Sequence, residues 1–333
     1  MLYHFAITPE VFEPWSINGM IPAGVVLTQL LRGIAEDGLL ANLHAGEWMT
    51  HVRKHQRAEG ISPDVRDRIE SCLRTLHDRN RLVRHPRGSD GYAADDFRWL
   101  QWALERHRES PFSAIVASDE LVELAEVTES FVVPLSRALD DDSWTERTRT
   151  PEFEKTESNL RKYVKPLLAH AQKLTLIDPY MNCREDRFLN TVELCANLMG
   201  RHDGNVKSGT IQIHAGDPET TGPDAHRESV RDRLARWETS LTPIARHTGH
   251  TFRVLLWKRK PGGKHFHDRY LITDQCGIEA PGGLDFLPDD EEERASLTTW
   301  AMLDDEVTRN ILLNQFHHAK SPYQYLGATR AEP

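Results

Sequence analysis

Closely spaced cysteines are missing from this sequence. It contains four cysteines among 333 residues, and no two of them form a C-x-x-C pair. Small disulfide-bonded domains and zinc-binding modules both depend on several cysteines in close spacing, so these two classes are disfavoured. We expect the four thiols to be free and buried.

Long apolar runs and a secretory signal are missing as well. No apolar run approaches the roughly 20 residues that a transmembrane helix needs. The opening residues, MLYHFAITPE, lack a basic start followed by an apolar stretch. Repeats and low-complexity tracts are also lacking. With 39% hydrophobic and 28% charged residues the composition is that of an ordinary globular protein, and we expect a cytoplasmic location.

A positive net charge is the third absence. The formal net charge is -10, which argues against broad, nonspecific coating of nucleic acid. A local basic cleft is still compatible with an acidic protein. Four basic residues lie between positions 258 and 264, whereas acidic runs occupy 140–142 and 289–293. Each run is either a solvated loop or part of a charged site.

Helical spacing of apolar residues dominates the first third of the chain. In segments such as 26–34 and 65–76, apolar side chains recur every three or four positions. We therefore predict a mainly helical N-terminal domain over residues 1–110. Residues 111–150 are predicted to be either a connector or the start of the following domain, and 112–117 is a candidate strand within them.

Strands and helices alternate between residues 151 and 322. Short apolar segments such as 174–177 and 252–257 alternate with helical stripes, of which 230–244 is the clearest. This order predicts an α/β fold, in which a mixed sheet carries helices on both faces. Ligands in such folds gather at the ends of strands. Residues 323–333 are expected to form a tail.

The segment KHFHDRYLITD, residues 264–274, holds the clearest candidate site. Side chains alternate faces along a strand, so His267 and Arg269 are predicted to project from one face, within reach of one phosphate. Asp274 falls where that strand ends. A neutral nitrogen of His267 can attack phosphorus covalently, and Arg269 can pair two phosphate oxygens. A second histidine can protonate the leaving oxygen, and the scheme requires no metal or other cofactor.

This segment resembles the H-x-K-x(4)-D motif of the phospholipase D superfamily. His267 and Asp274 match the motif, and Arg269 stands where the family has lysine. The two basic side chains are not interchangeable at a phosphate site. The family's G-[ST]-x-N turn corresponds to GGLD at 282–285, one residue late and with Asp285 in place of asparagine.

A closer resemblance is to the C-terminal domain of MIT-domain proteins. HDRYLITD followed by GGLDF is similar to the HDR and GLD[YF]F signature of that domain, and the resemblance covers about residues 150–320. It implies a phospholipase-D-like fold. It also implies a dimeric membrane-binding module, as in the eukaryotic relatives, or a role in conflict and defence systems, as in bacterial ones.

The motif occurs once in the chain. His51 and His77 begin similar segments, but Ala58 and Arg84 occupy the acid positions. Single-motif members of the superfamily build one site from two chains. The resemblance therefore implies a symmetric homodimer through the phospholipase-D-like domain, with His267 of each chain facing one cleft.

Five further residues are candidate substrate contacts, each with a plainer alternative. Lys264 and His265 either contact a phosphate or are exposed residues beside the motif. Asp178 ends a predicted strand, where it either supports the site or caps a loop. Gly283 either brings a backbone amide to a phosphate or only makes a turn, and Asp285 belongs to the same turn.

Structural roles are the alternative for the motif residues themselves. His267 is alternatively bonded to Asp274, and Arg269 alternatively neutralises Asp268 or Asp285. A metal site here is disfavoured, because the segment lacks the further ligands that a hydrolytic metal centre needs.

Two functions follow from these patterns. The first is a metal-independent nuclease of a prokaryotic defence system, which acts on nucleic acid through a phosphohistidine at His267. The second is a non-catalytic dimeric module that binds anionic membrane lipid or another phosphate-bearing partner. In either case the N-terminal domain is a candidate docking site for a partner protein. Trp99 and Trp102 within it either build a core or stack on nucleobases.

Overall fold

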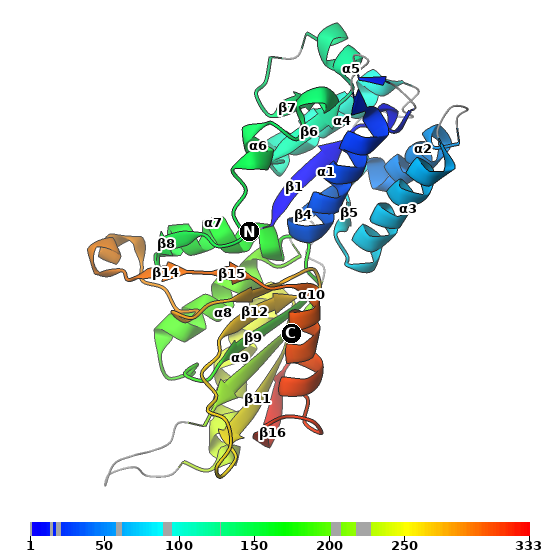
Figure 1. Cartoon of the computed structure of the whole chain (residues 1–333). Helices are drawn as coiled ribbons and strands as arrows, with labels where there is room; N and C mark the ends of the chain where they lie inside the picture. The colour runs from blue at the N-terminus through cyan, green and yellow to red at the C-terminus, as the bar shows by residue number, and fades with distance from the viewer. Residues whose placement is uncertain are drawn as a thin grey trace. The chain divides into compact units, whose positions relative to one another are not determined.

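The computed structural model describes residues 2–13, 16–17, 21–57, 62–88, 95–126, 128–200, 208–217 and 228–333. The chain divides into two compact units, Met1–Thr148 and Arg149–Pro333 (Figure 1). Every helix in the described ranges is too short or too polar to cross a membrane. The four cysteines are free and buried, as expected.

A five-stranded parallel sheet forms the centre of the N-terminal unit, in the order β5-β4-β1-β6-β7. Its strands are β1 Tyr3–Ile7, β4 Gly38–Asn42, β5 Leu82–Arg84, β6 Ala114–Ala117 and β7 Val132–Pro134. The helices are α1 Ala23–Asp37, α2 Glu47–His55, α3 Pro63–Asp78, α4 Asp96–Glu109, α5 Asp119–Leu124 and α6 Asp142–Thr145. A short pair, β2 Ser16–Ile17 with β3 Ile21–Pro22, precedes α1. Each connection within the sheet passes through at least one helix, as parallel pairing requires.

This sheet corrects the prediction of a mainly helical domain over residues 1–110. That stretch also supplies β1, β4 and β5, and residues 111–150 complete the same sheet with β6 and β7. The first unit therefore ends at Thr148. β6 falls within the candidate strand 112–117. The strands of residues 1–110 were missed because they are short and largely buried, so their sequences lack the alternation that marks a half-buried strand.

The helical stripes of this unit were predicted correctly. Ser62 caps α3 by accepting a hydrogen bond from the amide of Val65 at 3.3 Å, and Asp95 caps α4 in the same way. Trp99 and Trp102 are 1% and 2% exposed and meet edge to face, with ring centroids 5.0 Å apart. These two indoles belong to the core, so they are not a platform for nucleobases.

A seven-stranded mixed sheet forms the centre of the C-terminal unit, in the order β15-β13-β12-β9-β10-β11-β16. Its strands are β9 Lys173–Asp178, β10 Thr210–Gly216, β11 Thr251–Arg259, β12 Tyr270–Thr273, β13 Gly277–Glu279, β15 Ala301–Met302 and β16 Tyr323–Ala331. β9, β10 and β11 are parallel, and the other pairings are antiparallel. A separate pair joins β8 Glu152–Glu154 to β14 Leu297–Thr299.

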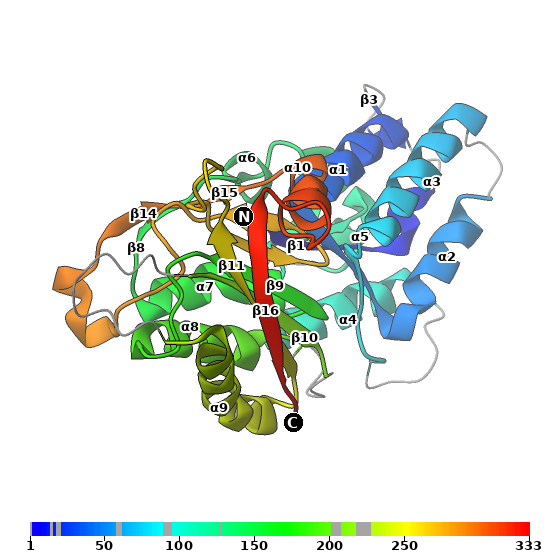
Figure 2. The ribbon, with the colours of Figure 1, turned by 90° about the horizontal axis from the view of Figure 1, so that it is seen from below.

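Helices cover both faces of this sheet. They are α7 Glu157–Leu168, α8 Asp186–Leu198, α9 Val230–Thr248 and α10 Asp305–Asn310, the last continued by a π-helical turn Ile311–Gln315. α7, α8 and α9 lie on one face and α10 on the other (Figure 2). On the α10 face, Ile311 and Phe316 pack in one apolar cluster with Ile177, Trp257 and Tyr323. The chain is thus an α/β protein, as predicted.

Two boundaries in this unit differ from the prediction. Residues 323–333 are not a tail, because β16 pairs antiparallel with β11 along most of its length. The sequence of β16 hides this role, since an edge strand is only partly buried and carries polar residues. β12 begins at Tyr270, so His267 and Arg269 lie just before the strand, and the strand alternation that was predicted to align them does not apply.

Candidate functional site

Strand pairing brings the motif beside a second loop. β12 runs antiparallel to β9, with the first residue of β12 opposite Ile177. Residues just before β12 and just after Ile177 therefore share one end of the sheet. His267 and Arg269 come from the first segment, and Asp178 and Tyr180 come from the second. The parallel strands β9 and β10 finish at this same end, where ligands gather in open α/β sheets.

Tyr180 joins the two motif side chains. Its hydroxyl lies 2.9 Å from Nδ1 of His267, and the guanidinium carbon of Arg269 lies 4.8 Å from the centre of its ring. Tyr180 is half exposed, and His267 is exposed. Tyr180 was not among the residues predicted to form the site. Its position two residues beyond a buried strand that ends in an acid was the available signal.

Asp178 forms an ion pair with Arg269. Its carboxylate is 1% exposed, accepts a hydrogen bond from the amide of Tyr180 at 2.9 Å, and lies 3.6 Å from Nε of Arg269. Burial raises the pKa of Asp178, while the Tyr180 amide and the Arg269 charge act against that rise. Arg269 also donates from Nη1 to the carbonyl of Pro281. The guanidinium is therefore held in place by the protein while part of it stays exposed.

A second imidazole and a second guanidinium extend the site. The rings of His265 and His267 are stacked with centroids 5.0 Å apart, and Nη1 of Arg259 lies 2.6 Å from Nε2 of His265. Because a guanidinium only donates, Nε2 of His265 accepts, and its ring carries its proton on Nδ1. Lys264 pairs with Asp268 at 3.4 Å in an exposed contact of small energetic weight.

Asp285 lies between two basic side chains. Nζ of Lys155 donates to one oxygen at 2.8 Å and to the carbonyl of Gly282 at 2.9 Å, and Nη1 of Arg187 reaches the other oxygen at 3.2 Å. Asp285 is therefore neutralised within the protein. The ion pair of Arg269 is with Asp178, so the alternatives in which Arg269 neutralises Asp268 or Asp285 are not what the structure shows.

Gly283 makes a turn. Its φ of +96° lies in the left-handed region that favours glycine, and an added Cβ would come within 2.7 Å of Oδ1 of Asp285. Its amide donates to the carbonyl of Ala280 at 2.9 Å. The turn is the alternative that the structure supports, because this amide already has a partner.

Asp274 lies at the opposite end of β12. Its Oδ1 accepts from the amides of Gln172 and Lys173 at 3.1 and 3.4 Å, beside the start of β9, and burial raises its pKa. The four residues of β12, at roughly 3.3 Å each, separate Asp274 from the motif's other two residues. The structure thus brings His267 and Arg269 together without Asp274. The alternative of a bond between His267 and Asp274 is wrong, since Nδ1 of His267 faces Tyr180.

Comparison with known proteins leaves the chain without a family. No family model matches it. No curated protein matches it either. Among solved structures it is similar to TrmBL2, an archaeal chromatin protein whose structure shows a novel mode of DNA binding, with 16% identity over 74% of this chain and 78% of that one. The TM-score of 0.25 is too low to establish a shared fold.

A buried carboxyl group in the N-terminal unit was missed by the sequence analysis. From β1 the chain proceeds to β4 and β5 on one side of the sheet, and then returns to form β6 and β7 on the other side. β1 and β6 therefore flank a topological switch point, and the crevice at such a point is the usual ligand position in open parallel sheets. Glu10 lies just after β1 and is 4% exposed. It accepts from Thr8 and from the amide of Ser118, while Oε2 has no hydrogen-bond partner among the described residues. Burial raises the pKa of Glu10 to about 7.

We expect Glu10→Gln to stabilise the protein at pH 8. The folded state holds the Glu10 proton up to about pH 7, against an ordinary pKa of 4.5. The free energy of unfolding of the wild type therefore falls as pH rises from 4.5 to 7. Glu10→Gln has an uncharged side chain of similar shape, so its free energy of unfolding lacks this decrease. The gain should be about 2–3 kcal/mol at pH 8 and close to zero at pH 4. Urea unfolding at both pH values measures it, and an equal effect at both would contradict the buried ionisation.

Proposed function

We propose that the C-terminal unit is a phospholipase-D-like phosphodiesterase, a nuclease that works without a metal through a phosphohistidine at His267. One observation carries the proposal. His267 is exposed at the end of the sheet where β9 and β10 finish, its Nδ1 has a partner in the hydroxyl of Tyr180, and Arg269 lies over the ring of the same tyrosine. A nucleophilic imidazole oriented by a third group, next to a fixed cation, is the arrangement that covalent phosphoryl chemistry needs.

The hydrogen bond to Tyr180 sets which nitrogen attacks. When Nδ1–H of His267 donates to the tyrosine oxygen, the lone pair of Nε2 points outward. Nε2 then attacks phosphorus, the bond from phosphorus to the leaving oxygen breaks, and that oxygen takes a proton from a protonated imidazole. Water next attacks phosphorus and gives a proton to that second imidazole, and the P–N bond breaks, which returns His267 to its starting state.

A second copy of the chain is the proposed source of the second imidazole. The motif occurs once, and the proton donor must face the leaving oxygen across the phosphate from Nε2 of His267. His265 stacks beside His267 instead of facing it. A symmetric dimer would place the two His267 side chains opposite each other and would supply Arg269 twice, once to each side of the phosphate.

Arg269 and Arg259 are the proposed charge-stabilising groups. Arg269 is fixed by Asp178 and by the carbonyl of Pro281, so little reorganisation is needed when negative charge develops on the phosphate oxygens. Arg259, which donates to His265, adds a second positive charge on the far side of the stacked imidazoles. Nucleic acid is the proposed substrate, and the short basic segment before the motif would contact its backbone.

Cleavage in the presence of EDTA tests this function. The full chain is incubated with single-stranded and duplex DNA and with RNA. Cleavage is measured after a neutral detergent quench, and the protein label is measured separately after an alkaline quench, in which a phosphohistidine survives. We expect cleavage without added metal and a ³²P label on the protein that acid releases. Activity that appears only with added Mg²⁺, or cleavage with no label on His267 by peptide mapping, would exclude the mechanism.

Tyr180→Phe should slow cleavage about 10-fold, because the imidazole loses the partner that fixes its orientation and tautomer. The substitution keeps the ring under Arg269, so substrate affinity should change little. Single-turnover rates at saturating substrate measure the effect. A wild-type rate in this variant would mean that the contact between the Tyr180 hydroxyl and His267 plays no part in catalysis.

The contacts of Arg269 favour the second function, a binding module without turnover. Two of its nitrogens already contact protein groups, Asp178 and the carbonyl of Pro281, so fewer donors remain for the oxygens that gain charge during turnover. Flotation with vesicles containing anionic lipid separates the two functions. Vesicle binding that Arg269→Ala removes, in a protein that cleaves none of the nucleic acids above, would favour the binding module.

A further inference from the structure

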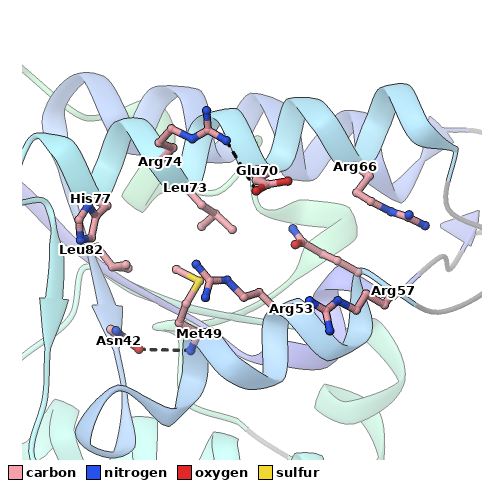
Figure 3. Close-up of a pocket in the computed structure, with 11 residues that line it drawn as sticks. Asn42, Met49, Arg53, Arg57, Arg66, Glu70, Leu73, Arg74, His77 and Leu82 are labelled. Atoms are coloured by element: carbon pink, nitrogen blue, oxygen red, sulfur yellow. Dashed lines mark hydrogen bonds and ion pairs between the residues drawn. The ribbon is translucent and has the colours of Figure 1, made fainter.

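Two helices of the N-terminal unit, α2 and α3, form the walls of an open pocket of about 500 Å³ (Figure 3). The lining residues of α2 and of the residues after it are Met49, Arg53, Gln56 and Arg57, and those of α3 follow a similar spacing from Arg66 to His77. Side chains at intervals of three and four share one face of a helix. The pocket is therefore lined by one continuous face from each helix.

Arg53, Arg57, Arg66 and Arg74 line this pocket together with one acid, Glu70. Arg53 and Arg57 line it from one side and Arg66 from the other, and Figure 3 shows Arg53 reaching into the space between the helices. In the part of the chain that the structure describes, none of these three guanidinium groups has an ion pair with an acid. Arg74, a fourth arginine at the pocket, lies 3.7 Å from Glu70. On an acidic protein, three unpaired arginines around one hollow indicate an anionic ligand.

Two buried hydrogen-bond donors at the pocket have no acceptor among the described residues. Gln56 is 6% exposed, and its side-chain nitrogen has no hydrogen-bond partner among the described residues. Nε of Arg66 is likewise buried without a partner in the described ranges. Buried polar groups in folded proteins are almost always bonded, so donors of this kind indicate a group that arrives from outside.

The pocket lining also has apolar members. Met49 of α2, Leu73 of α3 and Leu82 of β5 contribute to it, and Leu73 is buried. A flexible thioether beside two leucines suits a flat aromatic ring. The volume also falls within the range of roughly 300–1,000 Å³ that is usual for small-ligand sites.

We propose that this pocket binds a nucleotide, with phosphate groups at Arg53, Arg57 and Arg66 and the base between Met49 and Leu73. The amide of Gln56 would donate to an acceptor on the base. A nucleotide combines the three properties that the pocket matches, which are negative charge, a flat apolar ring and polar ring edges. This site is separate from the proposed phosphodiesterase site, because it lies in the N-terminal unit and is built from other residues.

Calorimetry with the full chain tests this site. The probes are ADP, ATP, pyrophosphate and a five-nucleotide DNA single strand, which distinguishes a free nucleotide from one within a strand. We expect ADP or ATP to bind with a Kd of about 10–100 µM. Pyrophosphate should bind at least about 10-fold more weakly, because it lacks the base. Equal affinity for pyrophosphate and ADP, or no binding of any probe at millimolar concentration, would overturn the proposal.

Matched variants locate the binding. Arg57→Glu combined with Arg66→Glu should weaken nucleotide affinity at least about 30-fold, whereas Arg68→Glu, an exposed arginine of α3 outside the pocket, should leave it unchanged. Arg57→Ala, a single change at an exposed position, serves if the double variant unfolds.

A variant of Gln56 tests recognition of the base. Gln56→Leu should weaken the binding of ADP but not that of pyrophosphate. Wild-type affinity in the arginine variants, or an equal loss in Arg68→Glu, would refute the site, and His267→Ala should bind as the wild type does.

Discussion

We expect His267→Ala to lower the proposed phosphodiester cleavage by at least about 1,000-fold, since removal of a covalent nucleophile costs this much or more in enzymes that depend on one. The imidazole is exposed, and its contacts among the described residues are with the exposed side chains of Tyr180 and His265, so the substitution should leave the fold intact. Single-turnover cleavage of a labelled oligonucleotide in EDTA measures the loss. Unchanged thermal unfolding establishes that the loss is chemical.

Two controls make this result specific. His247→Ala removes an exposed histidine from the last turn of α9 and should keep the wild-type rate. Mixing active chains with an excess of His267→Ala chains tests the shared site, since a dimer with one imidazole lacks the proton donor. Activity should then fall as the square of the active fraction. A linear fall would contradict a site built from two copies, and substantial cleavage by His267→Ala alone would exclude the nucleophile.

We expect Arg269→Ala to destabilise the C-terminal unit by about 3 kcal/mol at pH 8, because it leaves the buried carboxylate of Asp178 without its cation. Burial raises the pKa of Asp178 already, and loss of the guanidinium raises it further. Protonation of Asp178 then removes the unpaired buried charge from the folded state. The destabilisation should therefore shrink as pH falls through the raised pKa, and urea unfolding across pH 4–8 measures this trend.

A second substitution separates charge from packing in this effect. Asp178→Asn in the Arg269→Ala background removes the stranded charge and should recover most of the stability at pH 8. The amide oxygen of asparagine can still accept from the amide of Tyr180. A pH-independent loss, or no recovery in the double variant, would show that Arg269 stabilises the unit through its contacts with Tyr180 and Pro281 and not through its charge.

Local patterns were enough to predict the helices and the neighbourhood of His267 and Arg269. Helical stripes such as that of α9 depend on spacing within one segment, and so does the proximity of two residues that are two positions apart. The partners of these residues depend on pairing between distant segments. Tyr180 meets His267 only because β9 lies beside β12, and no local pattern encodes that register.

The same reason explains the error over Asp274. The sequence places it seven residues after His267, and the alternation argument left open whether the chain turns back. β12 does not turn back, so His267 and Asp274 lie beyond its opposite ends, at opposite ends of the neighbouring strand β9. In the N-terminal unit, Glu10 was missed because a parallel sheet was not expected there, and without its strand order there was no switch point to inspect.

The position of β1 in the N-terminal sheet decides how this chain can be divided for study. β1 is the central strand, and its neighbour on one side is β6, which begins at Ala114. A fragment that stops at residue 110 would leave the backbone of β1 open along that whole side, beside apolar side chains that normally lie under the sheet. Such an open edge recruits strands from other molecules, and interactions captured with that fragment would report self-association. Binding studies of this half therefore require residues 1–148, which carry the full sheet.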